Sequence, residues 1–160
     1  MSLPAQRRMG LSGGTELAYV TAGDPSNPAL LLLHGFPSSS RTFRDIIPGL
    51  ARVAYVIAPD LPGHGQSDVP PTPSFAAISE AISELLAHLV IGRRFIYVHD
   101  WGTAVGLQIA IQAPELVSGL IIQNANAHRT GFGPLVGRRI EVLVRTDKRE
   151  RNGRNPRPDL

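Results

Sequence analysis

A chain of 160 residues, of which 42% are hydrophobic, is long enough for one domain with a buried core, and this composition excludes a disordered protein. The chain has no cysteine, which excludes disulfides, thiolate metal ligands and a cysteine nucleophile, and we expect no cofactor. It has no apolar run of about 18 residues, and its first residues, MSLPAQRRMG, lack the apolar region of a secretion signal. We therefore expect a cytoplasmic protein that does not bind a membrane.

The net charge of +3 is concentrated near the end of the sequence. Residues 138–160 hold eight of the 16 Lys and Arg residues and four of the 13 Asp and Glu residues, which leaves eight against nine in residues 1–137. The sequence predicts a folded domain over 1–137 and a basic, irregular tail over 138–160. No basic stripe or aromatic platform elsewhere supports a nucleic-acid partner.

Five apolar runs have the character of β-strands. ELAYVTAG (16–23) and ALLLLHG (29–35) flank the turn sequence DPSNP, which predicts a hairpin. The continuous LLLL is typical of a strand that is buried on both faces of a sheet. The remaining three runs are AYVIAPD (54–60), FIYVHD (95–100) and SGLIIQN (118–124).

Helical patterns separate these runs. SRTFRDIIPGLA places apolar residues on one face, and Pro48 is expected to kink or end that helix. From Ser74 to Val90 apolar residues, Phe75 among them, recur at spacings of three and four, with Ser74 as the N-cap. A third helix follows residue 101 and stops near Pro114. Alternating strands and helices predict an α/β fold with a mostly parallel sheet and flanking helices.

Ligands of such sheets bind beyond the carboxyl ends of the strands. HGFP (34–37) and HDWG (99–102) both stand at such ends. His34 is expected to orient the loop that follows it. Asp60 is expected to brace the next turn, with lining of the pocket as the alternative, and His64 is expected to be a turn residue.

The stretch IYVHDWGTAVG (96–106) predicts a tight bend between a strand and a helix, with Asp100 at its apex. Such a bend lifts the side chain off the sheet and places it beside the free N–H groups of the first helical turn. The positive end of the helix favours the ionised carboxylate there. A positioned carboxylate can attack an electrophilic carbon and form an ester. The alternative for Asp100 is a helix N-cap.

LLLHGFP, APDLPGHGQSD and VHDWG, in this order and spacing, resemble the α/β-hydrolase superfamily. Aspartate at the bend resembles its epoxide hydrolase and haloalkane dehalogenase branch. The resemblance implies that Asp100 is the nucleophile, that the N–H groups of Phe36 and Trp101 form the oxyanion hole, and that Trp101 lines the substrate pocket. Haloalkane dehalogenases often carry Asn where Phe36 stands, which favours an epoxide hydrolase or a less defined hydrolase.

The sequence departs from the family pattern in two ways. Val98 stands where the family usually has glycine, two residues before the nucleophile, so the bend is expected to be packed differently or altered. The family's base histidine, third acid and helical cap belong to its C-terminal half, before which this chain is expected to be truncated. His128 is the only histidine after Asp100; it is expected to be a polar residue at the entry to the cap, with the role of base as the alternative.

The sequence therefore predicts a hydrolase with an Asp nucleophile that acts on a small epoxide or alkyl halide through an alkyl-enzyme ester. The alternative is an inactive, truncated remnant, or a binding module, that lacks the base and the third acid. In either case the sheet is expected to be incomplete at one edge. There SGLIIQN would form an exposed apolar edge, which favours low stability or self-association.

Overall fold

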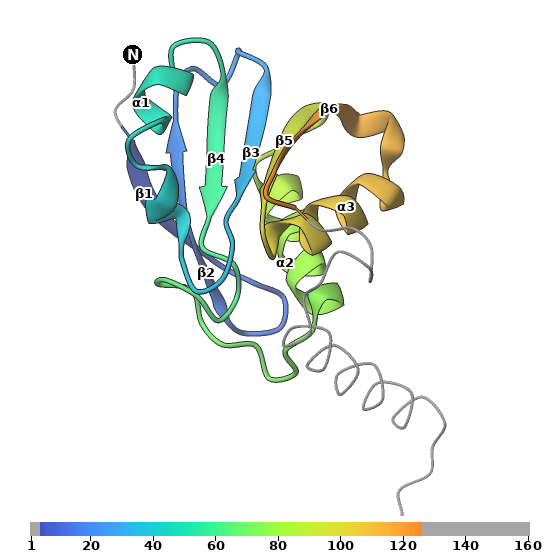
Figure 1. Ribbon diagram of the computed structural model, residues 1–160. Helices are drawn as coiled ribbons and strands as arrows, with labels where there is room; N and C mark the ends of the chain where they lie inside the picture. The colour runs from blue at the N-terminus through green and yellow to red at the C-terminus, as the bar shows by residue number, and fades with distance from the viewer. Residues whose placement is uncertain (1–3, 126–160) are drawn as a thin grey trace, which may run out of the picture. The chain divides into compact units, whose positions relative to one another are not determined.

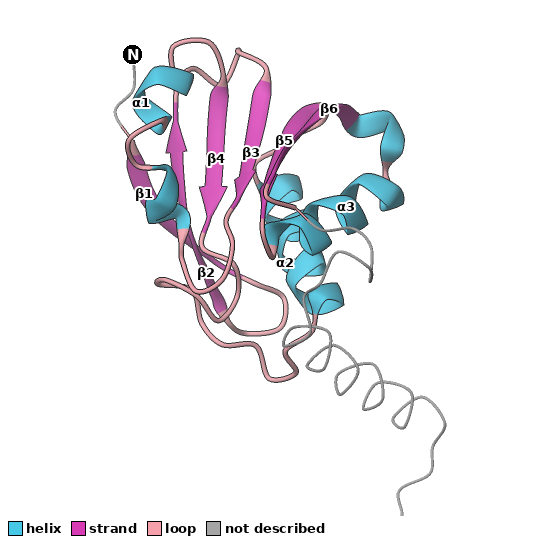
Figure 2. Ribbon diagram, viewed as in Figure 1, coloured by secondary structure: helices cyan, strands magenta, loops and turns pink. Residues whose placement is uncertain are grey.

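The computed structural model describes residues 4–125, which form a single sheet with helices on both of its faces (Figures 1 and 2). The strands are β1 (Ala5–Gly10), β2 (Glu16–Ala22), β3 (Ala29–Leu33), β4 (Tyr55–Pro59), β5 (Arg94–His99) and β6 (Val117–Gln123). The helices are α1 (Ile47–Leu50), α2 (Phe75–His88) and α3 (Gly102–Gln112), with short 3-10 turns at Ser40–Phe43 and Pro114–Leu116. All five runs predicted as strands, and the helices after Ser74 and residue 101, are confirmed.

The six strands form one sheet in the order β1-β2-β4-β3-β5-β6. β3 pairs in parallel with β4 and with β5, and β5 pairs in parallel with β6. β1 and β2 are antiparallel to their neighbours. The expected α/β fold with a mostly parallel sheet is therefore confirmed.

The predicted hairpin between residues 16–23 and 29–35 is wrong. β2 pairs with β1 and β4, so β4 lies between β2 and β3 in the sheet. The hairpin of this region is formed by β1 and β2, which are joined by a turn in which the Leu11 N–H donates to the Thr15 carbonyl. A turn sequence such as DPSNP shows that the chain reverses, but it does not fix which strand becomes the neighbour.

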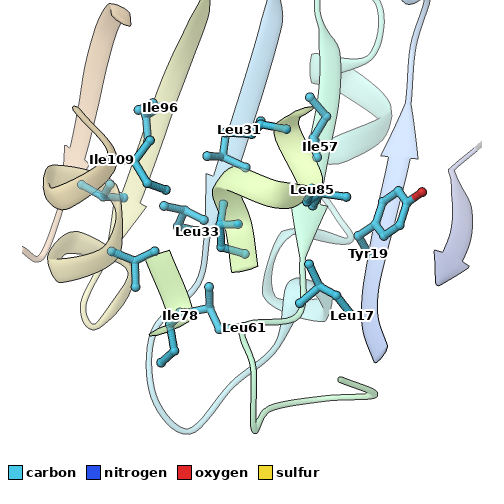
Figure 3. Close-up of a cluster of buried hydrophobic side chains, with 14 of the residues drawn as sticks. Leu17, Tyr19, Leu31, Leu33, Ile57, Leu61, Ile78, Leu85, Ile96 and Ile109 are labelled. Carbon is cyan, nitrogen blue, oxygen red and sulfur yellow. The ribbon is translucent and has the colours of Figure 1, made fainter. Parts of the chain in front are cut away.

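The sheet is covered on both faces, and β3 is its centre. Leu31 and Leu33 belong to a hydrophobic cluster that also contains side chains of α2 and α3 (Figure 3). Leu30 and Leu32 belong to a second cluster, which contains Phe43 and Ile47. Because alternate residues of a strand point to opposite faces, the run LLLL fills both cores. This burial holds the carboxyl end of β3 in place, where the next loop begins.

Pro48 begins a helix instead of ending one. The predicted helix over SRTFRDIIPGLA is divided into the 3-10 turn and α1, and Pro48 lies in the first turn of α1. Proline fits there because the first N–H groups of a helix have no partner within the helix.

α2 begins as predicted, with the Ser74 hydroxyl accepting a hydrogen bond from the Ala77 N–H. At its other end Val90 has φ of 55°. The Val90 and Ile91 N–H groups donate to the Ala87 and Leu86 carbonyls, which is the Schellman pattern that glycine usually completes. A β-branched residue in the left-handed region is strained.

We expect Val90→Gly to stabilise the protein by about 1 kcal/mol. It relieves about 1–2 kcal/mol of left-handed strain and costs about 0.5–1 kcal/mol of added freedom in the unfolded chain. The Val90 side chain is 88% exposed, so little packing is lost. Urea unfolding measures the change. Val53→Gly is the control, since Val53 is also exposed and is not among the residues with positive φ; equal destabilisation of both variants would contradict the prediction.

β6 is the edge strand of the described sheet, and Leu120, Ile121 and Ile122 are exposed on it. The apolar edge expected from SGLIIQN is therefore present in this part of the chain. Self-association through it remains a prediction, which sedimentation of the purified chain would test. In residues 4–125 no helix has the length and apolar character needed to cross a membrane.

Candidate active site

The bend after β5 places Asp100 between strand and helix, in the left-handed region with φ of 48°. Aspartate tolerates this conformation better than most residues with a side chain. The cap position of α3 belongs to Trp101, which makes no side-chain capping bond. The alternative role of Asp100 as an N-cap is therefore wrong, and its exposed side chain is available for other contacts.

Two glycines of α3 let the helix start close against the sheet. A Cβ on Gly102 would lie 2.8 Å from the His34 carbonyl oxygen, and closer still to that of Leu33. A Cβ on Gly106 would meet Cγ1 of Val98. The bulk of Val98 is thus accommodated by the missing side chain at position 106, and the bend forms with valine two residues before Asp100.

The Asp100 carboxylate is held by the loop after β3. Its Oδ1 accepts a hydrogen bond from the Phe36 N–H at 2.9 Å. A Cβ on Gly35 would lie 2.5 Å from Cβ and 2.8 Å from Oδ1 of Asp100, so only glycine allows this approach. Within residues 4–125 neither Oδ2 of Asp100 nor the Trp101 N–H has a hydrogen-bond partner. One carboxylate oxygen is fixed, and the other is free.

His34 connects this loop to the one after β4. Its side chain is fully buried; Nδ1 is 2.9 Å from the Gly35 carbonyl oxygen, and Nε2 is 2.9 Å from the Leu61 nitrogen. The Leu61 N–H donates to Nε2, so Nδ1 carries the proton and donates to Gly35. Burial lowers the pKa of His34, and this effect outweighs the hydrogen bond to Gly35, which favours the protonated form. The neutral ring therefore links Gly35 to Leu61.

The loop after β4 is braced by Asp60, as predicted. Oδ1 of this buried side chain accepts from the Ser40 N–H at 2.8 Å, and Oδ2 accepts from the Gln66 N–H at 2.9 Å. These bonds hold the turn that contains His64, whose ring centroid is 5.4 Å from that of His34. The turn therefore places His64 near the carboxyl ends of β3 and β5.

Four rings, hereafter the aromatic cluster, gather beside Asp100: Phe36, His64, Phe75 and Trp101. Phe36 and Trp101 stack at 4.8 Å with 28° between their planes. The rings of His64 and Phe75 contact Trp101 edge-on, at 6.1 and 5.5 Å. The structure thus brings together the predicted Phe36, Trp101 and Asp100, with His34 behind them.

Sequence reasoning missed two members of this cluster. His64 was expected to be only a turn residue, and Phe75 was placed on the apolar face of its helix. Phe75 is 39% exposed and lies outside both hydrophobic clusters. Its position at the start of α2, directly after the Ser74 cap, is the signal that separates it from the core-facing residues. His128, the boundary at 137 and the tail over 138–160 lie outside the described residues.

A parallel sheet with a tight bend after β5, an acid at the apex and a backbone donor from the loop after β3 define the α/β-hydrolase architecture. The family model for the alpha/beta hydrolase fold matches residues 28–145, and the chain belongs to this family.

The relatives include both kinds of enzyme that the motifs indicate. The chain is 42% identical to an uncharacterized hydrolase of Saccharomyces cerevisiae, over 76% of the chain and 44% of the relative. It is 37% identical to a soluble epoxide hydrolase of Corynebacterium sp., over 76% and 42%. The crystal structure of a haloalkane dehalogenase from Bradyrhizobium elkani superposes with a TM-score of 0.72 at 34% identity, over 76% of this chain and 42% of that one. The chain spans less than half the length of these relatives.

Proposed function

We propose that Asp100 is the nucleophile of a hydrolase that acts on a small epoxide or alkyl halide through an ester intermediate. The observation that carries this proposal is the asymmetry of the carboxylate: Oδ1 is held by the Phe36 N–H, while Oδ2 has no donor in the described part of the chain. A carboxylate fixed at one oxygen presents the other in a defined direction, which is what nucleophilic attack requires.

The first step forms the ester. Oδ2 attacks a carbon of the oxirane, the bond from that carbon to the ring oxygen breaks, and the resulting alkoxide takes a proton from water. With an alkyl halide, the carbon–halogen bond breaks and halide leaves. Phe36 offers no side-chain N–H to a halide, and the sequence pattern at this position therefore favours an epoxide.

The second step hydrolyses the ester. Water adds to Cγ of Asp100, and negative charge develops on Oδ1, the oxygen that the Phe36 N–H already contacts. The Trp101 N–H is the proposed second donor. Collapse of this intermediate breaks the bond from Cγ to Oδ2 and releases the alcohol. His34 serves this step by orienting the loop after β3. Its ring is fixed by the Leu61 N–H at Nε2, and its Nδ1 holds the Gly35 carbonyl.

Hydrolysis also needs a general base that takes the proton of the attacking water and returns it to the leaving alkoxide. Since both ring nitrogens of His34 are hydrogen-bonded, His34 cannot fill this role. His128 remains the candidate that the sequence offers. Without a base the first step still proceeds and the ester accumulates, so formation and hydrolysis of the ester are separate questions.

Intact-mass spectrometry after incubation with a reactive epoxide or an alkyl bromide tests the proposal. We expect one adduct per chain, and none in Asp100→Asn, which keeps the shape of the side chain but removes its charge. An adduct that persists shows a working nucleophile without a base; turnover that depends on Asp100 shows that a base is present. Adduct formation at the same rate in both proteins, or neither adduct nor Asp100-dependent turnover, would overturn the proposal.

A further inference from the structure

The aromatic cluster is more extensive than the proposed chemistry requires. Its members come from four separate segments: the loop after β3, the turn after β4, the start of α2 and the bend after β5. Phe36, Trp101 and Phe75 are 54%, 42% and 39% exposed. Contiguous exposed apolar surface of this kind marks a binding site more often than chance placement does.

The arrangement of the rings is suited to a flat partner. The near-parallel pair of Phe36 and Trp101 provides stacked ring faces, while Phe75 and His64 stand at 70° and 73° to Trp101. An aromatic ring beside them can make both offset-stacked and edge-to-face contacts, which aromatic pairs prefer at centroid distances of about 4.5–7 Å. A saturated ring of the same size gains only from burial of its surface. The cluster is therefore expected to bind an aromatic ring more tightly than a saturated ring of the same size.

The charge of Asp100 further restricts the class of ligand that fits the site. The Asp100 carboxylate lies beside Phe36 and is the charged group that faces the cluster from the bend. An anionic ligand would be repelled by it. A neutral ligand with an aromatic ring and a reacting carbon one or two bonds from that ring satisfies both the cluster and the carboxylate.

We infer that the site selects aryl-substituted epoxides: the ring binds to the aromatic cluster and places the oxirane carbon at Oδ2 of Asp100. This inference rests on the proposed function and adds the substrate class. The chemistry is unchanged, since the ester bond to Oδ2 forms while the bond from the attacked carbon to the ring oxygen breaks, and the alkoxide takes a proton from water.

The test compares two epoxides of equal intrinsic reactivity, benzyloxirane and (cyclohexylmethyl)oxirane, whose rings are separated from the oxirane by one CH₂ group. We expect the aryl compound to alkylate Asp100 about tenfold faster, as expected for one or two aromatic contacts. Phe75→Leu should bring the ratio of the two rates close to one. Phe95→Leu is the matched control, because Phe95 is also 39% exposed and lies outside the cluster, and it should keep the ratio.

A second measurement does not depend on alkylation. Trp101 is the only tryptophan of the chain, so its fluorescence reports on the cluster alone. We expect the unreactive 3-phenylpropane-1,2-diol to change this emission at a concentration about tenfold lower than 3-cyclohexylpropane-1,2-diol. Phe75→Leu should remove this difference as well, and Phe95→Leu should keep it.

The two measurements separate the inference from the function on which it rests. Equal alkylation rates and equal binding of the two diols would overturn the aryl preference while leaving Asp100 as the nucleophile. Preferential binding of the phenyl diol without any adduct would support the aromatic site and overturn the proposed function. A preference that survives unchanged in Phe75→Leu, or one that disappears in Phe95→Leu, would overturn the inference.

Discussion

Replacing Gly35 with alanine is expected to slow alkylation of Asp100 by about 10²-fold, the effect of a misplacement of about 1 Å at a reacting group. The new Cβ would lie 3.0 Å from Cγ of Asp100 and only 2.5 Å from its Cβ, and the second distance is nearer than such atoms approach in proteins. The Cβ of Asp100 is fixed by the bend between β5 and α3, so the loop after β3 must move. That movement lengthens the 2.9 Å bond from the Phe36 N–H to Oδ1.

The rate of adduct formation, followed by intact mass, measures this effect, and thermal unfolding shows the accompanying destabilisation of about 1–3 kcal/mol from overpacking. Gly92→Ala is the control, because a Cβ at position 92 meets no atom within 4 Å. It should leave both rate and stability unchanged. If Gly35→Ala reacts at the parent rate, the contact between the loop and Asp100 does not position the carboxylate.

Much of the fold was predictable because its signals are local. The run LLLL and the Ser74 cap each carry a physical signature within a few residues, and both elements form where expected. β1 was not predicted, because AQRRMG is largely polar and only Met9 is buried. The neighbour of β2 was mispredicted for a different reason. Strand pairing is decided by packing across the whole sheet, and the turn sequence between β2 and β3 does not indicate that β4 lies between them.

The same distinction applies to the site. Asp100, Phe36 and Trp101 belong to two short motifs whose order is informative, and the structure places these motifs side by side at the ends of adjacent strands. His64 and Phe75 join them only through the fold. Asp60 holds the turn of His64, and the direction of α2 brings Phe75 to Trp101. No spacing in the sequence expresses either contact, so the aromatic cluster could not be found before the structure.

The neutral, buried state of His34 predicts that the protein loses stability as the pH falls below about 6.5. Burial lowers the pKa of His34 in the folded state below its ordinary value of 6.5, which the unfolded chain retains. Between these two values the unfolded chain binds more protons than the folded protein, so the free energy of unfolding rises with pH. The full stability is therefore present above about pH 6.5 and decreases below it, by at most about 1.4 kcal/mol per pH unit for one proton.

Urea unfolding at pH values from 5 to 7.5 measures this slope, and Asp24, whose pKa is lowered from 3.8 by its bonds to Ser26, titrates below this range. His34→Asn should be less stable at every pH, because it breaks the link between Gly35 and Leu61, and its slope between pH 5 and 6.5 should be smaller. The exposed His88 provides the control, and His88→Asn should keep the slope of the parent. A slope that is unchanged in His34→Asn would mean that protonation of His34 does not oppose folding. Because the same ring orients the loop that holds Asp100, loss of adduct formation in parallel with stability below pH 6.5 would follow from this one protonation.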